Sequence, residues 1–237
     1  MSFRIKQIID ELKALGNSEI AEHSQRFFKT GAGEYGEGDI FLGIRVPIVR
    51  KCIKEYFTIS LHENLDLLKS PYHEARLLTL LILVKKYSSS KTSTEQKAIC
   101  QAYLKHTEFI NNWDLVDISA EHIVGAYLFN KNRRPLYRLV RSRILWERRI
   151  GVMATFYFIK KEDFSDTLTV AELLLKDERD LIHKAVGWML REVGNRNLKK
   201  EESFLNKHYK DEPRTMLRYA IEKFPERKRL AYLHGKR

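Results

Sequence analysis

The stretch LIHKAVGWMLREVG, residues 181–194, carries the polar pair His183 and Lys184 near its start and is mostly apolar afterwards, with the spacing of an amphipathic helix. Four other stretches align with it; they begin at residues 73, 111, 146 and 211 and read HEARLLTLLILVKKY, NNWDLVDISAEHIVG, WERRIGVMATFYFIKK and DEPRTMLRYAIEKFP. The fourth residues of the five stretches, at intervals of 38, 35, 35 and 30, are Arg76, Asp114, Arg149, Lys184 and Arg214. Because helix pairs repeated at such a period bury their apolar faces only by stacking, the pattern predicts an all-α solenoid of stacked helix pairs.

The rest of the chain also favours helices. Residues 3–15 have helical spacing, residues 18–29 predict a second helix with Ser18 as its cap, and Pro47 is suited to the first turn of a third. The glycine-rich stretch GAGEYGEGD, residues 31–39, lacks the GK[ST] ending and the preceding strand of a phosphate-binding loop, so we expect a flexible connector there. We therefore expect residues 1–237 to form one helical-repeat domain.

Composition excludes several classes of protein. Hydrophobic residues make up 43% of the chain and charged residues 31%, an ordinary globular balance, and no apolar run approaches the roughly 18 residues of a membrane span. The N-terminus lacks the apolar core and cleavage site of a signal peptide, so we expect a cytoplasmic protein with no membrane partner. Cys52 and Cys100 lie in apolar contexts, which favours buried thiols over a disulfide, and no histidine pattern indicates a metal site.

Positive charge is concentrated in the C-terminal half. The formal net charge is +12, but residues 1–130 hold 16 basic and 16 acidic side chains and are neutral. Residues 131–161 hold 10 basic side chains and one acidic, and residues 191–237 hold 14 basic and 7 acidic. This asymmetry favours a phosphate backbone as the partner, although a solubilising surface without a partner would have the same composition.

The fourth position of each stretch, which we call the register position, is basic in four of the five stretches. Equivalent positions of stacked repeats line up along one wall, so a row of Arg76, Arg149, Lys184 and Arg214 would follow a phosphate backbone, helped by the partial positive charge at helix N-termini. The alternative is that these residues stabilise the repeats by pairing with neighbouring acids. That alternative suits Arg76, in the neutral half, better than Arg149 or Arg214.

The acidic register residue, Asp114, interrupts this row. Trp113 and Asp117 are four residues apart and share a helix face, and Trp188 lies one turn after the register position of the fourth stretch. With Arg149, these residues would form a constellation in which indoles hold a sugar or base and a carboxylate stabilises a sugar cation or activates water. A buried core tryptophan and a structural aspartate are the alternative interpretation.

At these residues the sequence resembles the AlkD family of DNA alkylation repair glycosylases. The matching stretches run between about residues 20 and 230 and are FLGIRVPIVRK (41–51), NNWDLVD (111–117), LWERRIGVMATF (145–156), HKAVGWMLREVG (183–194) and PRTMLRYAIEKF (213–224). The resemblance implies a C-shaped stack of HEAT-like repeats with a basic concave face. It also implies excision of cationic N-alkylpurines, such as 3-methyladenine and 7-methylguanine, from double-stranded DNA without a metal or organic cofactor.

The resemblance assigns roles to individual residues. The family's essential carboxylate falls on Asp117, and the two tryptophans of the site fall on Trp113 and Trp188. The arginine that opens the next inner helix falls on Arg149, with Arg148 as the neighbouring register. We expect a monomer that associates with the nucleoid when it is bound to DNA.

Two other functions remain open from the sequence. One is a non-catalytic binder of branched or damaged DNA on the same scaffold, and the other is a HEAT-type scaffold for an acidic protein partner. The intact set of Trp113, Asp117 and Trp188 favours the glycosylase over the first, and the basic row favours DNA over the second.

Overall fold

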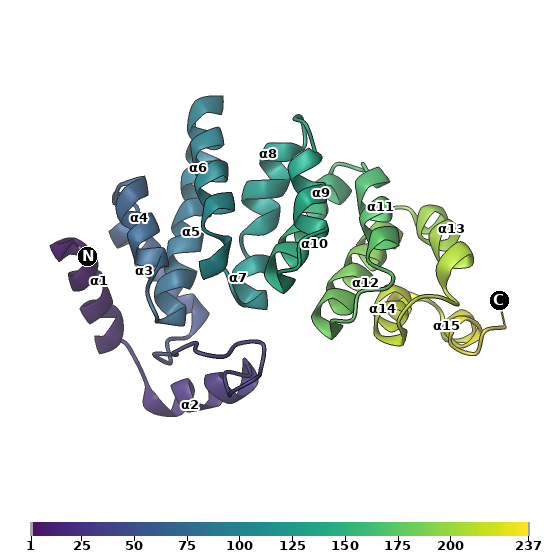
Figure 1. Ribbon diagram of the computed structural model, residues 1–237, viewed down its shortest axis with the longest axis horizontal. Coiled ribbons are helices and arrows are strands. Elements are labelled where there is room, and N and C mark those ends of the chain that lie inside the picture. Colours follow the sequence, from purple (N-terminus) through teal and green to yellow (C-terminus); the bar gives the residue numbers. More distant parts are fainter. Residues whose placement is uncertain (1, 237) are drawn as a thin grey trace. The chain divides into compact units, whose positions relative to one another are not determined.

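The computed structural model describes residues 2–236, and most of this part of the chain is helical (Figure 1). The described residues include no β-strand. The strand-like feature among them is an isolated bridge between Ile40 and Tyr72. The predicted all-α class is therefore confirmed. The chain divides into two compact units, one extending to Ile123 and the other beginning at Val124. A single domain over residues 1–237 stays a prediction.

The helices of the two units follow one another with short connections, except for residues 28–45, the segment that carries the glycine-rich stretch. The first unit contains α1 (Phe3–Ala14), α2 (Ser18–Phe27), α3 (Val46–Tyr56), α4 (Leu61–Leu68), α5 (His73–Ser89), α6 (Ser93–Lys105), the 3-10 turn η1 (Thr107–Phe109) and α7 (Trp113–Asp117). After the π-helical turn η2 (Glu121–Gly125), the second unit continues with α8 (Ala126–Leu128), α9 (Arg134–Val140), α10 (Leu145–Lys160), α11 (Ser165–Leu173), α12 (Asp180–Gly194), α13 (Leu198–His208), α14 (Arg214–Ala220), the 3-10 turn η3 (Ile221–Lys223) and α15 (Glu226–Leu233).

Side-chain caps define where several helices begin. The Ser60 hydroxyl and the Glu63 carboxylate form a reciprocal capping box at α4, and Thr92 and Glu95 form another at α6. At α2 the cap is Asn17, whose Oδ1 accepts the amide of Ile20 at 3.0 Å. Ser18, the predicted cap, is instead the first helical residue, because Asn17 already supplies the acceptor.

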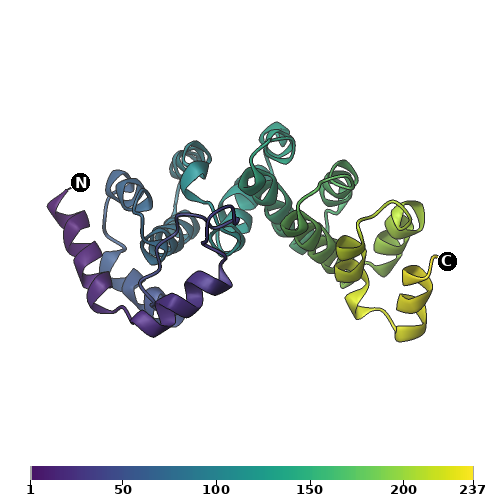
Figure 2. The same cartoon turned by 60° about the horizontal axis from the view of Figure 1, so that its bottom comes forward.

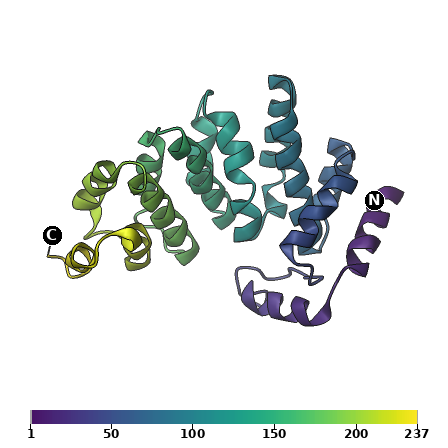
Figure 3. The ribbon, with the colours of Figure 1, turned by 180° about the vertical axis from the view of Figure 1, so that it is seen from behind.

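The second unit is built from two layers of helices. α12 packs between α10 and α14, which is the side-by-side stacking predicted for the stretches that begin at residues 146, 181 and 211. α9 packs on α10, α11 on α10 and α12, and α13 on α12, so these three helices form the other layer (Figures 2 and 3). In the first unit, α5 takes the central position and contacts α3, α4, α6 and α7.

Gly187 of α12 allows a close approach between α12 and α14. A Cβ atom at this position would lie 2.4 Å from the Met216 carbonyl oxygen and 2.6 Å from the Tyr219 Cβ. We therefore expect Gly187→Val to lower the free energy of unfolding by about 1–3 kcal/mol, since the two helices must separate. Urea unfolding would measure this loss. Ser203→Val, at an exposed site on α13, is the control, and equal stability of the two variants would contradict the prediction.

Two carboxyl groups of the second unit are buried with oxygens that lack a hydrogen-bond partner among the described residues. Glu201 is 1% exposed and Glu212 is 5% exposed. Burial raises the pKa of both carboxyl groups to about 8, and the neighbouring Glu212 charge contributes to the shift at Glu201. The folded protein therefore binds more protons than the unfolded chain between pH 4.5 and about 8.

This proton linkage predicts that the native protein loses stability as pH rises through that interval. Glu212→Gln removes one titrating group, so its thermal midpoint should fall less between pH 5 and pH 9 than that of the native protein. Each such group changes the free energy of unfolding by at most about 1.4 kcal/mol per pH unit within the interval. The exposed Glu226→Gln is the matched control. Parallel profiles for all three proteins would show that Glu212 is ionised in the folded state.

Candidate active site

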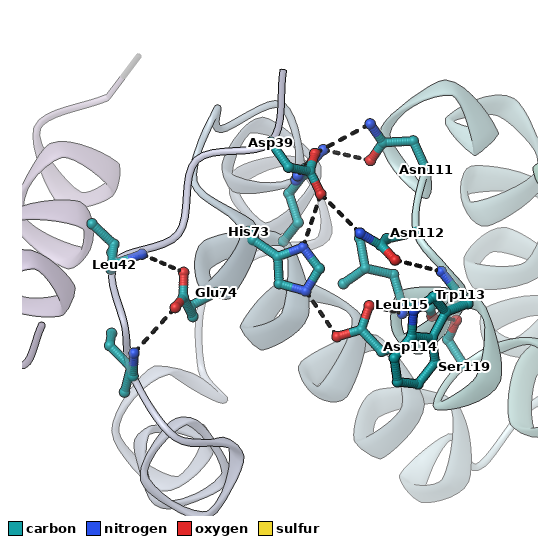
Figure 4. Close-up of polar contacts among 12 residues, drawn as sticks. Asp39, Leu42, His73, Glu74, Asn111, Asn112, Trp113, Asp114, Leu115 and Ser119 are labelled. Atoms are coloured by element: carbon teal, nitrogen blue, oxygen red, sulfur yellow. Dashed lines mark hydrogen bonds and ion pairs between the residues drawn. The ribbon is translucent and has the colours of Figure 1, made fainter. Parts of the chain in front are cut away.

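The first turn of α5, residues 73–76, anchors the loops of the first unit. The buried carboxylate of Glu74 accepts hydrogen bonds from three consecutive amides: that of Leu42 at 2.8 Å, which Figure 4 shows, that of Gly43 at 2.8 Å and that of Ile44 at 3.1 Å. Gly43 has φ +80°, and a Cβ there would lie 2.0 Å from the Asn17 carbonyl oxygen, so this turn requires glycine. The turn formed by the FLGIRV motif, residues 41–46, thus binds the carboxylate of Glu74 through its backbone amides.

Asp39, at the end of the glycine-rich stretch, is the centre of a buried polar network. Its carboxylate accepts from Arg76 Nη2, from Asn111 Nδ2 at 3.3 Å and from Asn112 Nδ2 at 3.2 Å (Figure 4). Arg76 also donates to Asn111 Oδ1 at 2.6 Å. The expected flexible connector is therefore a run of hydrogen-bonded turns that joins α5 to the residues preceding α7.

His73 joins this network to α7. Its Nδ1 lies 3.1 Å from Asp39 Oδ2, and its Nε2 lies 2.8 Å from Asp114 Oδ2. Burial alone would lower the pKa of His73, but the charges and hydrogen bonds of Asp114 and Asp39 raise it to about 9. Burial would likewise raise the pKa of Asp39, and its bonds with His73 and Arg76 lower it to about 2. At neutral pH, His73 is therefore an imidazolium held between the carboxylates of Asp39 and Asp114.

Asp114 therefore has a different role from the one that its register position indicates. We expected its carboxylate to stand in a row of phosphate-facing side chains. It is instead engaged by the His73 imidazolium, and its other carboxylate oxygen accepts from the Leu115 amide at 2.8 Å. The negative charge at this position is neutralised within the first unit.

A stack of aromatic rings extends the network to Trp113. Phe41 stacks on His73 with ring centroids 4.3 Å apart, Phe28 stacks on Phe41 at 4.9 Å, and Trp113 stacks on Phe28 at 5.1 Å. Phe27 meets the Trp113 ring edge-on at 6.0 Å. The Trp113 indole is half-buried, and its orientation is set by these contacts.

The helix α7 carries both predicted catalytic residues of the first unit. The Asn112 side chain accepts the Trp113 amide at 2.8 Å at the start of α7, and Asp117 is the last residue of the helix. Asp117 is half-buried. The pKa of the Tyr103 hydroxyl is raised mainly by the burial of Tyr103 itself, and the negative charge of Asp117 adds to this shift. Trp113 and Asp117 thus lie on one short helix. The buried network of Asp39, His73 and Asp114, which we call the His73 network, holds the first turn of this helix.

A cavity of about 620 Å³ opens beside this network within the first unit. Its lining includes His73, Asp114, Glu74 and the aromatic rings of Phe28 and Phe41. Neither Trp113 nor Asp117 is part of its lining. The cavity therefore lies beside the residues that hold α7 in place, and the predicted catalytic carboxylate of Asp117 does not line it.

The two arginines that open α10 are held by protein groups of the second unit. Arg149 is only 5% exposed, and its Nη1 donates to the Leu181 carbonyl oxygen at 2.6 Å. Arg148 donates from Nε to Asp177 Oδ2 at 2.6 Å and from Nη1 to the Ser142 carbonyl oxygen at 3.0 Å. Both contacts tie α10 to neighbouring segments, as the repeat-stabilising alternative expects, and phosphate binding by Arg148 and Arg149 stays a prediction.

The remaining predicted residues of the second unit are more accessible. Lys184 forms an ion pair with Asp180 at 2.7 Å on the surface of α12, and Arg214 is exposed with Nη1 donating to the Leu233 carbonyl oxygen at 2.8 Å. Trp188 is half-buried beside Phe156, with ring centroids 6.0 Å apart. The Lys160 ammonium lies 4.3 Å from the centroid of the Phe156 ring, so the surroundings of Trp188 are aromatic and basic.

The sequence did not indicate the residues that support α7. Neither His73 nor Asp39 stands in a catalytic or metal-binding motif, so the sequence predicts no role for them. The signals that could have found them are the polar HEAR turn at the start of a largely apolar helix and the two adjacent asparagines, Asn111 and Asn112, ahead of α7. Buried polar side chains in such positions require partners, but the sequence does not show that Asp39 is the partner.

Over the described residues, the chain has no helix with the length and apolar character of a membrane span. The same part of the chain has no group of three or more histidine, cysteine or acidic side chains placed to hold a metal ion. Cys52 and Cys100 are both buried and free, as predicted.

Solved structures of several bacterial proteins are similar to this chain. A predicted DNA alkylation repair enzyme from Enterococcus faecalis superposes with a TM-score of 0.69 at 17% identity, covering 89% of this chain and 97% of that one. AlkD2 from Streptococcus mutans has a TM-score of 0.58 at 15% identity, with coverage of 94% and 99%. The protein smu.31 from Streptococcus mutans UA159 has a TM-score of 0.55 at 16% identity, with coverage of 94% and 100%. At these identities the likeness establishes a shared fold.

The family relationship comes from the sequence. No curated protein matches this chain. The model of the family described as DNA alkylation repair enzyme matches residues 8–224, which includes the His73 network, α7 and the helices α10, α12 and α14. This chain belongs to the DNA alkylation repair enzyme family.

Proposed function

We propose that this protein is a monofunctional DNA glycosylase that excises cationic N-alkylated purines, such as 3-methyladenine and 7-methylguanine, by hydrolysis of the N-glycosidic bond. The observation that carries the proposal is that Trp113 and Asp117 lie four residues apart on α7, a helix whose first turn a buried network holds in place. Membership of the DNA alkylation repair family supports DNA as the substrate.

The chemistry of the lesion suits these residues. A purine alkylated at N3 or N7 is cationic and leaves readily, so cleavage mainly requires stabilisation of the positive charge that develops on the deoxyribose. A fixed carboxylate supplies that stabilisation and can orient the attacking water. Indole faces tolerate a nearby cation and hold a sugar. We assign the first task to Asp117 and the second to Trp113 and Trp188.

DNA binding is assigned to the second unit. Lys184 and Arg214 are accessible at the starts of α12 and α14 and can contact phosphates directly. Arg148 and Arg149 would need to exchange or share their protein partners to do so. The proposed partner is double-stranded DNA with alkylated bases, bound by a monomer, and the proposed reaction uses no cofactor.

The test is release of methylated bases from alkylated double-stranded DNA, with spontaneous depurination subtracted. We expect the native protein to release 7-methylguanine and 3-methyladenine well above that background. Binding of the same DNA without release would contradict the glycosylase and favour the non-catalytic binder of damaged or branched DNA.

A further inference from the structure

The segment that contains α9 carries the densest run of positive charge in the chain. Residues 131–143, KNRRPLYRLVRSR, include six basic side chains and no acidic one. The run is not needed to form the helix, whose apolar residues Leu136, Leu139 and Val140 are buried. Its cations therefore require an explanation other than folding.

One arginine of this run points into the second unit and is fully engaged. Arg133 Nη1 donates to Asp163 Oδ2 at 2.7 Å and pairs with Asp166, while its guanidinium lies 4.3 Å from the centroid of the Phe158 ring. Tyr137 donates its hydroxyl to Asp166 Oδ1 at 2.6 Å. The two nearby acids, Asp163 and Asp166, are thus used by internal contacts.

Three other arginines form an exposed strip, which we call the arginine face: Arg134, Arg138 and Arg141. They stand at i, i+4 and i+7, and among residues 2–236 none of them has an ion-pair partner. Together with Asn132, Pro135 and Tyr137 they line an open cavity of about 910 Å³. The Arg141 guanidinium lies 5.7 Å from the centroid of the Tyr137 ring. Three like charges gathered on one strip repel one another unless an anion is bound.

The geometry of the arginine face matches a nucleic acid backbone. Seven residues of helix span about 10.5 Å, which is the axial length of roughly three nucleotides of one DNA strand. A membrane surface fits less well, because a helix that lies on lipid presents bulky apolar residues beside its cations. The bulky aliphatic residues of α9, Leu136, Leu139 and Val140, are buried.

We infer that the arginine face is a second DNA-backbone contact surface, separate from the Lys184 and Arg214 positions. α9 belongs to the layer of α11 and α13, whereas Lys184 and Arg214 lie in the layer of α10, α12 and α14. The inference rests on the proposed function only in taking DNA as the partner. It adds contacts that are independent of base identity, which position the protein on undamaged DNA.

The test uses the full chain with Arg134, Arg138 and Arg141 each changed to Gln, and undamaged double-stranded DNA as the ligand. The affinity should fall, and the slope of log K against log salt concentration should decrease by about 2.7, at 0.9 for each phosphate that an arginine no longer neutralises. The control carries Gln at Lys91, Lys97 and Lys105, three exposed lysines of the first unit, and loses the same net charge. Its slope should equal that of the native protein.

Several outcomes separate this inference from the proposed function. An unchanged slope in the arginine variant, with native circular dichroism and thermal midpoint, overturns the inference whatever the glycosylase assay gives. An equal decrease of slope in the lysine control also overturns it, because net charge would then explain the effect. Loss of binding to anionic phospholipid vesicles without loss of DNA binding identifies a membrane partner and overturns it. A lower slope in a protein that releases no methylated base supports the inference and contradicts the glycosylase.

Discussion

Asp117→Asn should lower the single-turnover rate of 7-methylguanine excision by about 10²–10³, the usual cost of removing one electrostatic group that stabilises a transition state. Asparagine keeps the size and shape of the side chain but carries no charge to stabilise the sugar cation. Duplex affinity should be retained or increased, because a negative charge near DNA phosphates is lost. The measurement is base release from alkylated DNA at saturating protein, with depurination in its absence subtracted.

The matched control for this variant is Glu108→Gln, at an exposed acid of η1 a short distance before α7 in the chain. It removes the same charge without changing α7, so its excision rate should equal that of the native protein. Excision by Asp117→Asn at the native rate would show that Asp117 is not the catalytic group. A drop of equal size in both variants would assign the effect to overall charge.

Asp39→Ala should lower the free energy of unfolding by about 3–5 kcal/mol, because it leaves buried cations without one of their counter-ions. Asp39 accepts from Arg76 and His73, both buried, and its loss also removes the acceptor that the Asn111 and Asn112 side chains use. Urea unfolding monitored by circular dichroism would measure the change. Asp10→Ala, which removes an exposed acid 3.7 Å from Lys13, should change stability by at most about 0.5 kcal/mol.

The pH dependence of the native protein gives a second measurement on the same network. The raised pKa of His73 contributes stability that is complete below pH 6.5 and is lost as pH rises through about 9. The lowered pKa of Asp39 contributes stability that is present above pH 3.8 and is lost as pH falls through about 2. Asp39→Ala should therefore abolish the acid-side loss due to this group. A variant as stable as Asp10→Ala at neutral pH would show that the network is not a stability centre.

The Asp39 variant also connects stability to catalysis. His73 holds Asp114 in the first turn of α7, and Asn112 holds the Trp113 amide, so weakening this network should misplace Trp113 and Asp117 before the unit unfolds. Excision should then fall at temperatures where the fold is still intact. This makes Asp39 and His73 positioning residues, in contrast to Asp117, whose replacement should reduce excision without reducing stability.

The sequence by itself determined the class of fold and the position of the principal helices. The stretches that begin at residues 73, 146 and 181 coincide with α5, α10 and α12, because the alternation of polar and apolar residues over a few turns is a local property. The placement of Trp113 and Asp117 on one helix was also predictable, since residues four apart in a helix lie on one face. The family resemblance relied on these same local motifs.

Only the tertiary structure decided which polar side chains meet. Asp39 reaches His73 across 34 residues of sequence, and His73 reaches Asp114 across 41, through packing that no local pattern encodes. For the same reason, the sequence shows that Arg133, Arg134 and Arg149 are cationic but not which way they face. Arg133 and Arg149 are turned toward a carboxylate and a carbonyl oxygen, and Arg134 toward solvent, because a guanidinium is directed by the partners that folding brings within its reach.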